Sequence, residues 1–156
     1  MPSDWKCDWV NLLSHLNPND EGIIKMVYNK QLIGLMKISF YPAQDNNISN
    51  PDFLEISNIE AKPIENRKFN PVGFWLIWYA CQMAFLYCKA NGEEDLITLD
   101  SLEDAMTYYE DQVMMEPLGW ATIAPGEDGY AFRFTRKGAA SFCSRIENRY
   151  GKPVRI

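Results

Sequence analysis

The residues best suited to binding an anion lie just before a long apolar stretch in the middle of the chain. Arg67 and Lys68 come first, and Asn70, Pro71 and Gly73 follow them. Asparagine followed by proline is typical of a helix start. A helix start presents unpaired N–H groups and a partial positive charge, and both favour a phosphate. The sequence therefore predicts a phosphate site here, with a solvated basic pair before an ordinary helix as the alternative.

The common phosphate-binding motifs are missing from this stretch. No GKS or GKT occurs, and no GxGxxG follows the preceding strand-like segment. A Walker loop and a dinucleotide-binding fingerprint are therefore excluded.

The apolar stretch itself has two interpretations. Its twenty residues from Phe69 to Cys88 carry no charge, and a helix from Pro71 to Asn91 would be long enough to cross a bilayer. Yet a strand-like segment at 53–61 precedes it, and another at 96–99 follows closely. A strand, helix and strand in this order form a βαβ crossover, whose helix packs on the sheet. We therefore expect a core helix, with a membrane span as the open alternative.

Composition limits the class of protein. The 156 residues carry a net charge of −6 and are 47% hydrophobic, which predicts one domain over 1–156 and makes nucleic acid an unlikely partner. The four cysteines form no CxxC and His15 is the single histidine, so no metal site is expected. The first residues, MPSDWKCDW, do not read as a signal peptide, so we expect a cytoplasmic protein.

The remaining elements follow from periodicity and turn residues. Helical spacing runs from Trp5 to Leu16, and a second helical face comprises Ala139, Ala140, Phe142, Cys143 and Ile146. Hairpins are expected at 23–40, around Asn29-Lys30, and at 120–135, around 125–128. A helix with a capping box is expected from Ser101 to about Gln112. The order predicts a mixed α/β, α+β-like domain.

The segment 53–61 has a break in its alternation. Leu54 and Ile56 share one parity, whereas Ile59 and Ala61 share the other. An extra residue near Ser57-Asn58 would bring both pairs to one face, as in a β-bulge. A strand buried on both faces would give the same pattern.

Two stretches of this chain resemble the GNAT superfamily of N-acetyltransferases. NIEAKPIENRKFNPVGFWLIWYACQMAF (58–85) is similar to motif A, in which a strand, a loop that binds the coenzyme A pyrophosphate and a long helix follow one another. LITLDSLEDAMTYYED (96–111) is similar to motif B, with Ala105-x-x-Tyr108-Tyr109-Glu110 in place of A-x-x-F-Y-E. The resemblance covers about residues 22–135. It implies a mostly antiparallel mixed sheet flanked by helices, with one βαβ crossover.

The chain departs from the family pattern at the pyrophosphate loop. One glycine of Q/R-x-x-G-x-G/A is replaced by Pro71, which removes an amide donor, and the loop between Pro63 and Gly73 is about two residues longer than usual. No separate first strand is evident before Gly22. An inactive GNAT-like module that binds coenzyme A or a partner is therefore the alternative to an enzyme.

The resemblance implies a reaction and its residues. Acetyl-CoA would donate its acetyl group directly to a primary amine of a small-molecule or peptide acceptor. Tyr109 would be the general acid for the departing thiolate, Glu60 the base, preferred over Glu55, and Asn58 would orient water. Coenzyme contacts would come from Ile59, Ala61, Asn66, Arg67, Lys68, Asn70, Val72, Gly73, Ser101 and Ala105. Among protein partners, a homodimer stays open.

Overall fold

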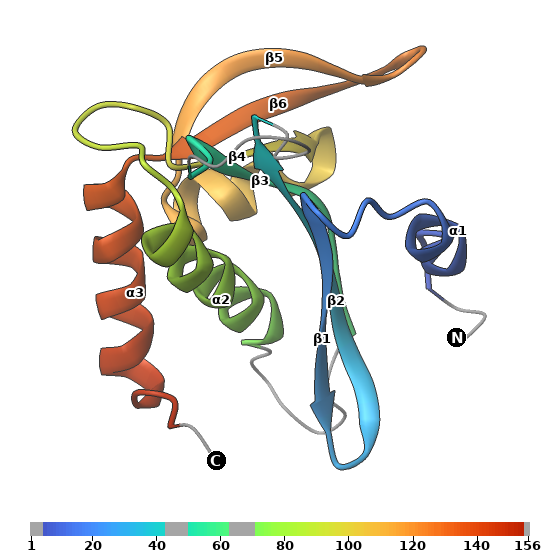
Figure 1. Ribbon diagram of the computed structural model, residues 1–156, viewed down its shortest axis with the longest axis horizontal. Helices are drawn as coiled ribbons and strands as arrows, with labels where there is room; N and C mark the ends of the chain where they lie inside the picture. The colour runs from blue at the N-terminus through green and yellow to red at the C-terminus, as the bar shows by residue number, and fades with distance from the viewer. Residues whose placement is uncertain (1–4, 43–49, 63–70, 155–156) are drawn as a thin grey trace.

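The computed structural model describes residues 5–42, 50–62 and 71–154, which form one six-stranded sheet with helices on its faces (Figure 1). In chain order the elements are α1 (Trp9–Ser14), β1 (Glu21–Tyr28), β2 (Gln31–Tyr41), β3 (Phe53–Ala61), α2 (Val72–Tyr87), β4 (Ile97–Leu102), the 3₁₀ turn η1 (Glu103–Ala105), the π-helical turn η2 (Tyr108–Val113), β5 (Glu116–Ala124), β6 (Glu127–Phe134) and α3 (Arg136–Tyr150). The order across the sheet is β1-β2-β3-β4-β6-β5. Only β3 and β4 run parallel, joined through α2, so the predicted mixed sheet with one βαβ crossover is confirmed.

The first hairpin is formed as the sequence predicts. Tyr28 pairs with Gln31, which leaves Asn29 and Lys30 as a two-residue loop. Both residues have positive φ angles, 48° and 63°. A turn with two positive φ angles matches the twist of the strands that it connects.

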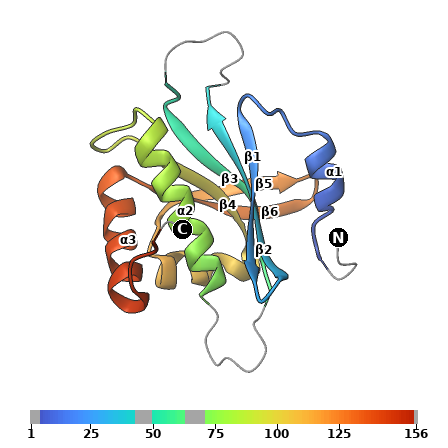
Figure 2. The same cartoon turned by 60° about the horizontal axis from the view of Figure 1, so that its bottom comes forward.

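The apolar helix α2 lies in the core, as the βαβ pattern predicts. It packs with α3 on one face of the sheet (Figures 1 and 2), and Leu76, Ile77, Ala80 and Cys81 are buried there. Among the described residues, no helix has both the length and the apolarity of a membrane span.

The predicted limits of this helix are wrong at both ends. Pro71, not Asn70, occupies the N-cap position, and the helix ends at Tyr87 rather than Asn91. The C-terminal end is set by long-range pairing, because the N–H groups of Lys89 and Ala90 bind the carbonyls of Pro51 and Asp52 at 2.8 and 3.0 Å. Those two amides hold the chain in an extended conformation after Cys88.

The N-terminal segment covers the other face of the sheet. Trp5 and Trp9 are buried against Leu35 of β2 in a small second core. The predicted helix from Trp5 to Leu16 is shorter in the structure: α1 starts at Trp9, capped by the Asp8 side chain, and Leu13 is exposed. Trp5 is therefore buried by the sheet rather than by a helical stripe.

In the C-terminal half, the structure differs from several details of the sequence-based predictions. Ser101 lies in β4 and donates its hydroxyl to the carbonyl of Leu102, so it is not a helix cap; helical turns begin at Glu103. The second hairpin is confirmed, but its turn is only Pro125-Gly126. Ala140 is exposed, whereas the other four apolar residues predicted for that helix are buried.

Candidate active site

The sheet opens at the point where β3 is irregular. β3 pairs with β4 only from Leu54 to Ile56, and the two strands have no further pairing beyond Ile56. On its other side, Asn58 is opposite Lys37, and Ile56 is opposite Ile38, so Ser57 is an extra residue. The predicted bulge is confirmed, and it lies at the start of the opening.

Polar side chains fix the bulge on the face of the sheet opposite α2. The hydroxyls of Ser57 and Ser39 are 3.2 Å apart, and Ser39 donates to Glu21 at 3.2 Å. Lys37 forms an ion pair with the same Glu21 carboxylate at 3.2 Å. The amide of Asn17 is the largest cause that lowers the pKa of Glu21, followed by other groups that include Lys37. Glu21 is therefore charged at neutral pH and holds both neighbours.

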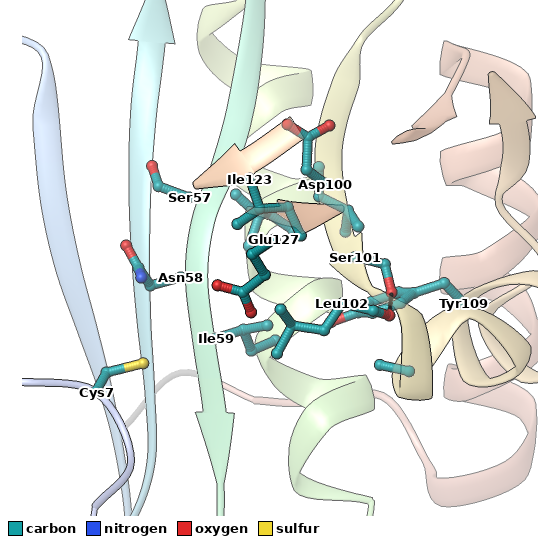
Figure 3. Close-up of a pocket in the computed structure, with 13 residues that line it drawn as sticks. Cys7, Ser57, Asn58, Ile59, Asp100, Ser101, Leu102, Tyr109, Ile123 and Glu127 are labelled. Carbon is teal, nitrogen blue, oxygen red and sulfur yellow. Dashed lines mark hydrogen bonds between the residues drawn. The ribbon is translucent and has the colours of Figure 1, made fainter. Parts of the chain in front are cut away.

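A cavity of about 310 Å³ fills the opening between β3 and β4. Its wall comprises Cys7, Ile56, Ser57, Asn58, Ile59, Leu99, Asp100, Ser101, Leu102, Ala105, Tyr109, Ile123 and Glu127. We call it the acceptor cavity. In Figure 3, Glu127 lies between Asn58 on one side and Ser101 and Tyr109 on the other. The β5–β6 hairpin supplies Ile123 and Glu127, and the N-terminal segment supplies Cys7, so segments far apart in the sequence line this cavity.

A second cavity, of about 230 Å³, leads toward the start of α2. We call it the coenzyme cavity. It is lined by Ile59, Ala61, Gly73, Tyr108 and Tyr109. Ile59 and Tyr109 line both cavities, so these two residues mark where the cavities meet.

Tyr109 is held rigidly at this junction. It is only 7% exposed, with its ring against Tyr108 at 5.1 Å and Phe132 at 5.9 Å between centroids. Burial raises the pKa of its hydroxyl to about 12. The phenol therefore keeps its proton at neutral pH, which a proton donor requires.

Tyr108 lies over the first turn of α2. Its ring stacks on Phe74, with centroids 5.6 Å apart and planes 10° from parallel. A Cβ atom at Gly73 would be 2.7 Å from the Tyr108 hydroxyl oxygen. A side chain at Gly73 would therefore have to displace the Tyr108 hydroxyl, a contact that sequence reasoning did not predict.

Glu60 has a different place from the one predicted. Its carboxylate accepts hydrogen bonds from the amides of Lys6 and Cys7, at 2.7 and 3.0 Å, and from the indole of Trp9, at 3.2 Å. Burial alone would raise the pKa of Glu60, but these donors together lower it. Glu60 lines neither cavity. Its geometry favours anchoring of the N-terminal segment over the predicted role as base.

Because Glu60 binds the amides of the N-terminal segment, this segment contributes a residue to the acceptor cavity. Cys7, whose amide binds Glu60, lines the acceptor cavity. Burial, followed by the charge of Glu60, raises the pKa of the Cys7 thiol, so the thiol stays protonated at neutral pH. Cys7 therefore adds a neutral wall to the cavity.

Apart from Glu60, the predicted site residues divide into three groups. Around the two cavities the structure places Asn58, Ile59, Ala61, Gly73, Ser101, Ala105 and Tyr109. The side chain of Val72 is buried in the core, so only its backbone can face a ligand. Asn66, Arg67, Lys68 and Asn70 lie outside the described residues.

Sequence reasoning missed Asp100 and Glu127. Asp100 is the last residue of the LITLD run, and Glu127 was assigned to a hairpin turn. Both line the acceptor cavity because β6 pairs with β4 and returns the hairpin to the opening. No local pattern links residue 127 to the strand at 53–61, so only the sheet order reveals it.

Comparison with known proteins gives a fold and no close relative. No family model matches the chain, and no curated protein matches its sequence. Among solved structures, an uncharacterized protein from Bacillus halodurans has a TM-score of 0.64 at 12% identity, over 90% of this chain and 72% of that one. The aminoglycoside acetyltransferase AAC(6')-Ib, solved with coenzyme A and kanamycin, has a TM-score of 0.53 at 13% identity, over 79% and 71%. The CoA-dependent acyl-homoserine lactone synthase BjaI, solved with SAM and isopentyl-CoA, has a TM-score of 0.55 at 9% identity, over 89% and 70%.

The fold is therefore that of the GNAT N-acetyltransferases. The mostly antiparallel mixed sheet, its flanking helices and the α2 crossover agree with what the resemblance of the two sequence motifs implies.

Proposed function

We propose that this protein transfers an acetyl group from acetyl-CoA to a primary amine of a small-molecule acceptor. The observation that carries the proposal is the junction of the two cavities at Tyr109. One cavity leads to the helix start suited to a phosphate, and the other opens on the face opposite α2. A thioester and an amine could enter from different sides and meet beside one buried phenol.

The coenzyme would occupy the coenzyme cavity. Its pantetheine would follow the unpaired edge of β3 at Ile59 and Ala61, where the β4 ladder has ended. Ser101 and Ala105 line the acceptor cavity, so they would contact only the thioester end of the pantetheine, where the two cavities adjoin. The pyrophosphate would bind the first amides of α2, at Val72 and Gly73, and the predicted loop residues Asn66, Arg67, Lys68 and Asn70 would supply further donors and charge.

The chemical step would be a direct transfer. The neutral amine nitrogen attacks the thioester carbonyl carbon, a C–N bond forms, and the C–S bond breaks. Tyr109 gives its proton to the departing thiolate. The attacking amine loses a proton to a carboxylate, either directly or through a water that Asn58 orients.

We assign the proton acceptor to Glu127 in preference to Glu60. Glu127 lines the acceptor cavity, and none of the described residues forms a hydrogen bond or ion pair with its carboxylate. Glu60 is bound by three donors instead. A base needs a free lone pair within reach of the amine, and Glu127 meets that need better.

Neighbours of the same fold support this class of reaction. The compared structures include acyltransferases solved with coenzyme A or an acyl-CoA, and one of them holds kanamycin, a small-molecule acceptor. These likenesses support CoA-dependent acyl transfer in general. The acetyl group and the amine acceptor rest on the motif resemblance and on the cavity.

Calorimetry with acetyl-CoA, followed by a free-thiol release assay on a panel of amines, tests the proposal. We expect binding, and thiol release with at least one amine, with gain of an acetyl group by that amine in mass spectrometry. Absence of acetyl-CoA binding would overturn the proposal. Binding without release from any amine would favour the inactive module, whose support is the amide donor lost at Pro71.

A further inference from the structure

The wall of the acceptor cavity has carboxylates but no positively charged side chain. Asp100 and Glu127 line it, and none of its thirteen lining residues is lysine, arginine or histidine. Neither carboxylate forms a hydrogen bond or ion pair with any residue in the described ranges. The wall therefore presents negative charge that the protein itself does not neutralise.

A third carboxylate, Glu55, lies near Asp100 but does not line the cavity. Glu55 on β3 is opposite Thr98 on β4, so Glu55 and Asp100 project from the same face of the sheet. Burial, and then the charge of Asp100, raise the pKa of Glu55, and the smaller effect of Lys37 lowers it without reversing the shift. Lys37 is already paired with Glu21 at 3.2 Å. A cation between Asp100 and Glu55 would relieve their repulsion.

A separate observation locates the reacting end of the ligand. Tyr109 is 7% exposed, lines the cavity, and its hydroxyl has no hydrogen-bond partner among the described residues. The side chain is buried, but its hydroxyl reaches the open cavity, where a ligand atom can form a hydrogen bond with it. In Figure 3 the Asp100 carboxylate lies apart from both Glu127 and Tyr109, so a ligand could contact Asp100 at one point and the other two residues at another.

We propose that the acceptor is a linear diamine or longer polyamine, which is recognised at two points. One amine lies between Glu127 and Tyr109 and is acetylated. A second, charged ammonium binds Asp100 beside Glu55 and is not changed. This inference rests on the proposed acetyl transfer for its chemistry, whereas the second cation site can be measured by binding alone.

The test uses the full chain saturated with coenzyme A, so that no turnover occurs. Calorimetry compares n-butylamine with a series of diamines from 1,2-diaminoethane to 1,6-diaminohexane, with a chelator present. We expect the best diamine to bind at least about tenfold more tightly than butylamine, since one charge-assisted contact is added. The optimal length then reports the separation of the two positions.

Asp100→Asn removes the second contact without touching the reacting end. We expect this variant to lose most of the preference for the diamine over butylamine. Asp128→Asn is the matched control, because Asp128 is exposed on β6, the strand that pairs with β4, but does not line the acceptor cavity. Equal binding of butylamine and all diamines would overturn the inference, as would an unchanged preference in Asp100→Asn.

A thiol-release assay distinguishes failure of the second cation site from failure of the proposed acetyl transfer. Release from acetyl-CoA with butylamine, without any preference for diamines, would leave acetyl transfer standing and remove the second cation site. Tight diamine binding that depends on Asp100, without thiol release, would retain the site and remove the acetyl transfer.

Discussion

At the scale of single residues, Tyr109 should act in the chemical step rather than in binding. Its ring is packed between Tyr108 and Phe132, and Tyr109→Phe keeps that packing while removing the proton. General acid catalysis contributes roughly 10²–10⁴-fold, so kcat should fall at least about tenfold with little change in the affinity for acetyl-CoA. Steady-state kinetics and calorimetry measure the two effects.

Tyr108→Phe is the matched control for this assignment. Its hydroxyl lies near Gly73, on the coenzyme side. Full turnover in Tyr109→Phe together with loss of turnover in Tyr108→Phe would show that Tyr108 is the general acid. Full turnover in both variants would give the role to water.

Glu60 should stabilise the protein in a pH-dependent way. Its pKa is lowered in the folded state, so its contribution is present above its usual value of 4.5 and is lost as the pH falls through the folded value. Glu60→Gln replaces one accepting oxygen by an NH₂ group that faces N–H donors. Urea unfolding should therefore show a large loss of stability at pH 7 that shrinks toward pH 3.

The control for Glu60 is Glu103→Gln, a change at an exposed carboxylate. That variant should match the wild type at both pH values. Equal stability of Glu60→Gln and wild type at pH 7 would show that the three hydrogen bonds add nothing to folding.

At the scale of elements, α2 should behave as a core helix. Ile77 is fully buried at its centre, and Ile77→Ala should lower the free energy of unfolding by ~2–5 kcal/mol. Tyr79, two residues along, is 41% exposed, so Tyr79→Ala should cost much less. Denaturant unfolding compares them, and equal losses would contradict the packing of this helix.

The contact of α2 with β2 depends on Gly34. A Cβ atom there would be 2.8 Å from Val72 Cγ1 and 3.0 Å from Leu76 Cδ1. Gly34→Ala should cost ~1–3 kcal/mol of stability and weaken acetyl-CoA binding, because it displaces the first turn of α2. Gly22→Ala is the control, since its nearest neighbour would be an ordinary 3.9 Å away. Similar effects of the two changes would refute the close approach.

How far the sequence predicts the structure differs from element to element. The change of parity between Leu54-Ile56 and Ile59-Ala61 indicates either a bulge or a strand buried on both faces, and the strand pairing shows that the bulge is present. The βαβ order likewise places the apolar helix in the core. Such features are local or follow from chain order.

Features set by distant partners could not be predicted. The end of α2 depends on pairing of Lys89 with Pro51, and the anchoring of Glu60 depends on amides more than fifty residues away. Asp100 and Glu127 come together only because β6 lies between β4 and β5. Periodicity carries no information about such contacts, so the sequence did not predict that two carboxylates line the acceptor cavity.

At the scale of the whole molecule, coenzyme binding should raise thermal stability. A ligand that binds only the folded state at 100 times its Kd adds about 2.7 kcal/mol, which for a chain of 156 residues corresponds to roughly 5–10 °C in Tm. Pantetheine alone lacks the pyrophosphate and should give a smaller shift at equal concentration. Thermal melts with each ligand measure this, and equal shifts would remove the phosphate site at α2.

The early end of the β3–β4 ladder also has a mechanical consequence. β3 has nine residues, yet only three of them pair with β4. The sheet thus consists of two three-stranded halves, β1-β2-β3 and β4-β6-β5, joined by that short ladder and by α2, which contacts both. A small rotation of one half against the other about this short ladder would change the width of the opening without breaking the strand pairings within either half.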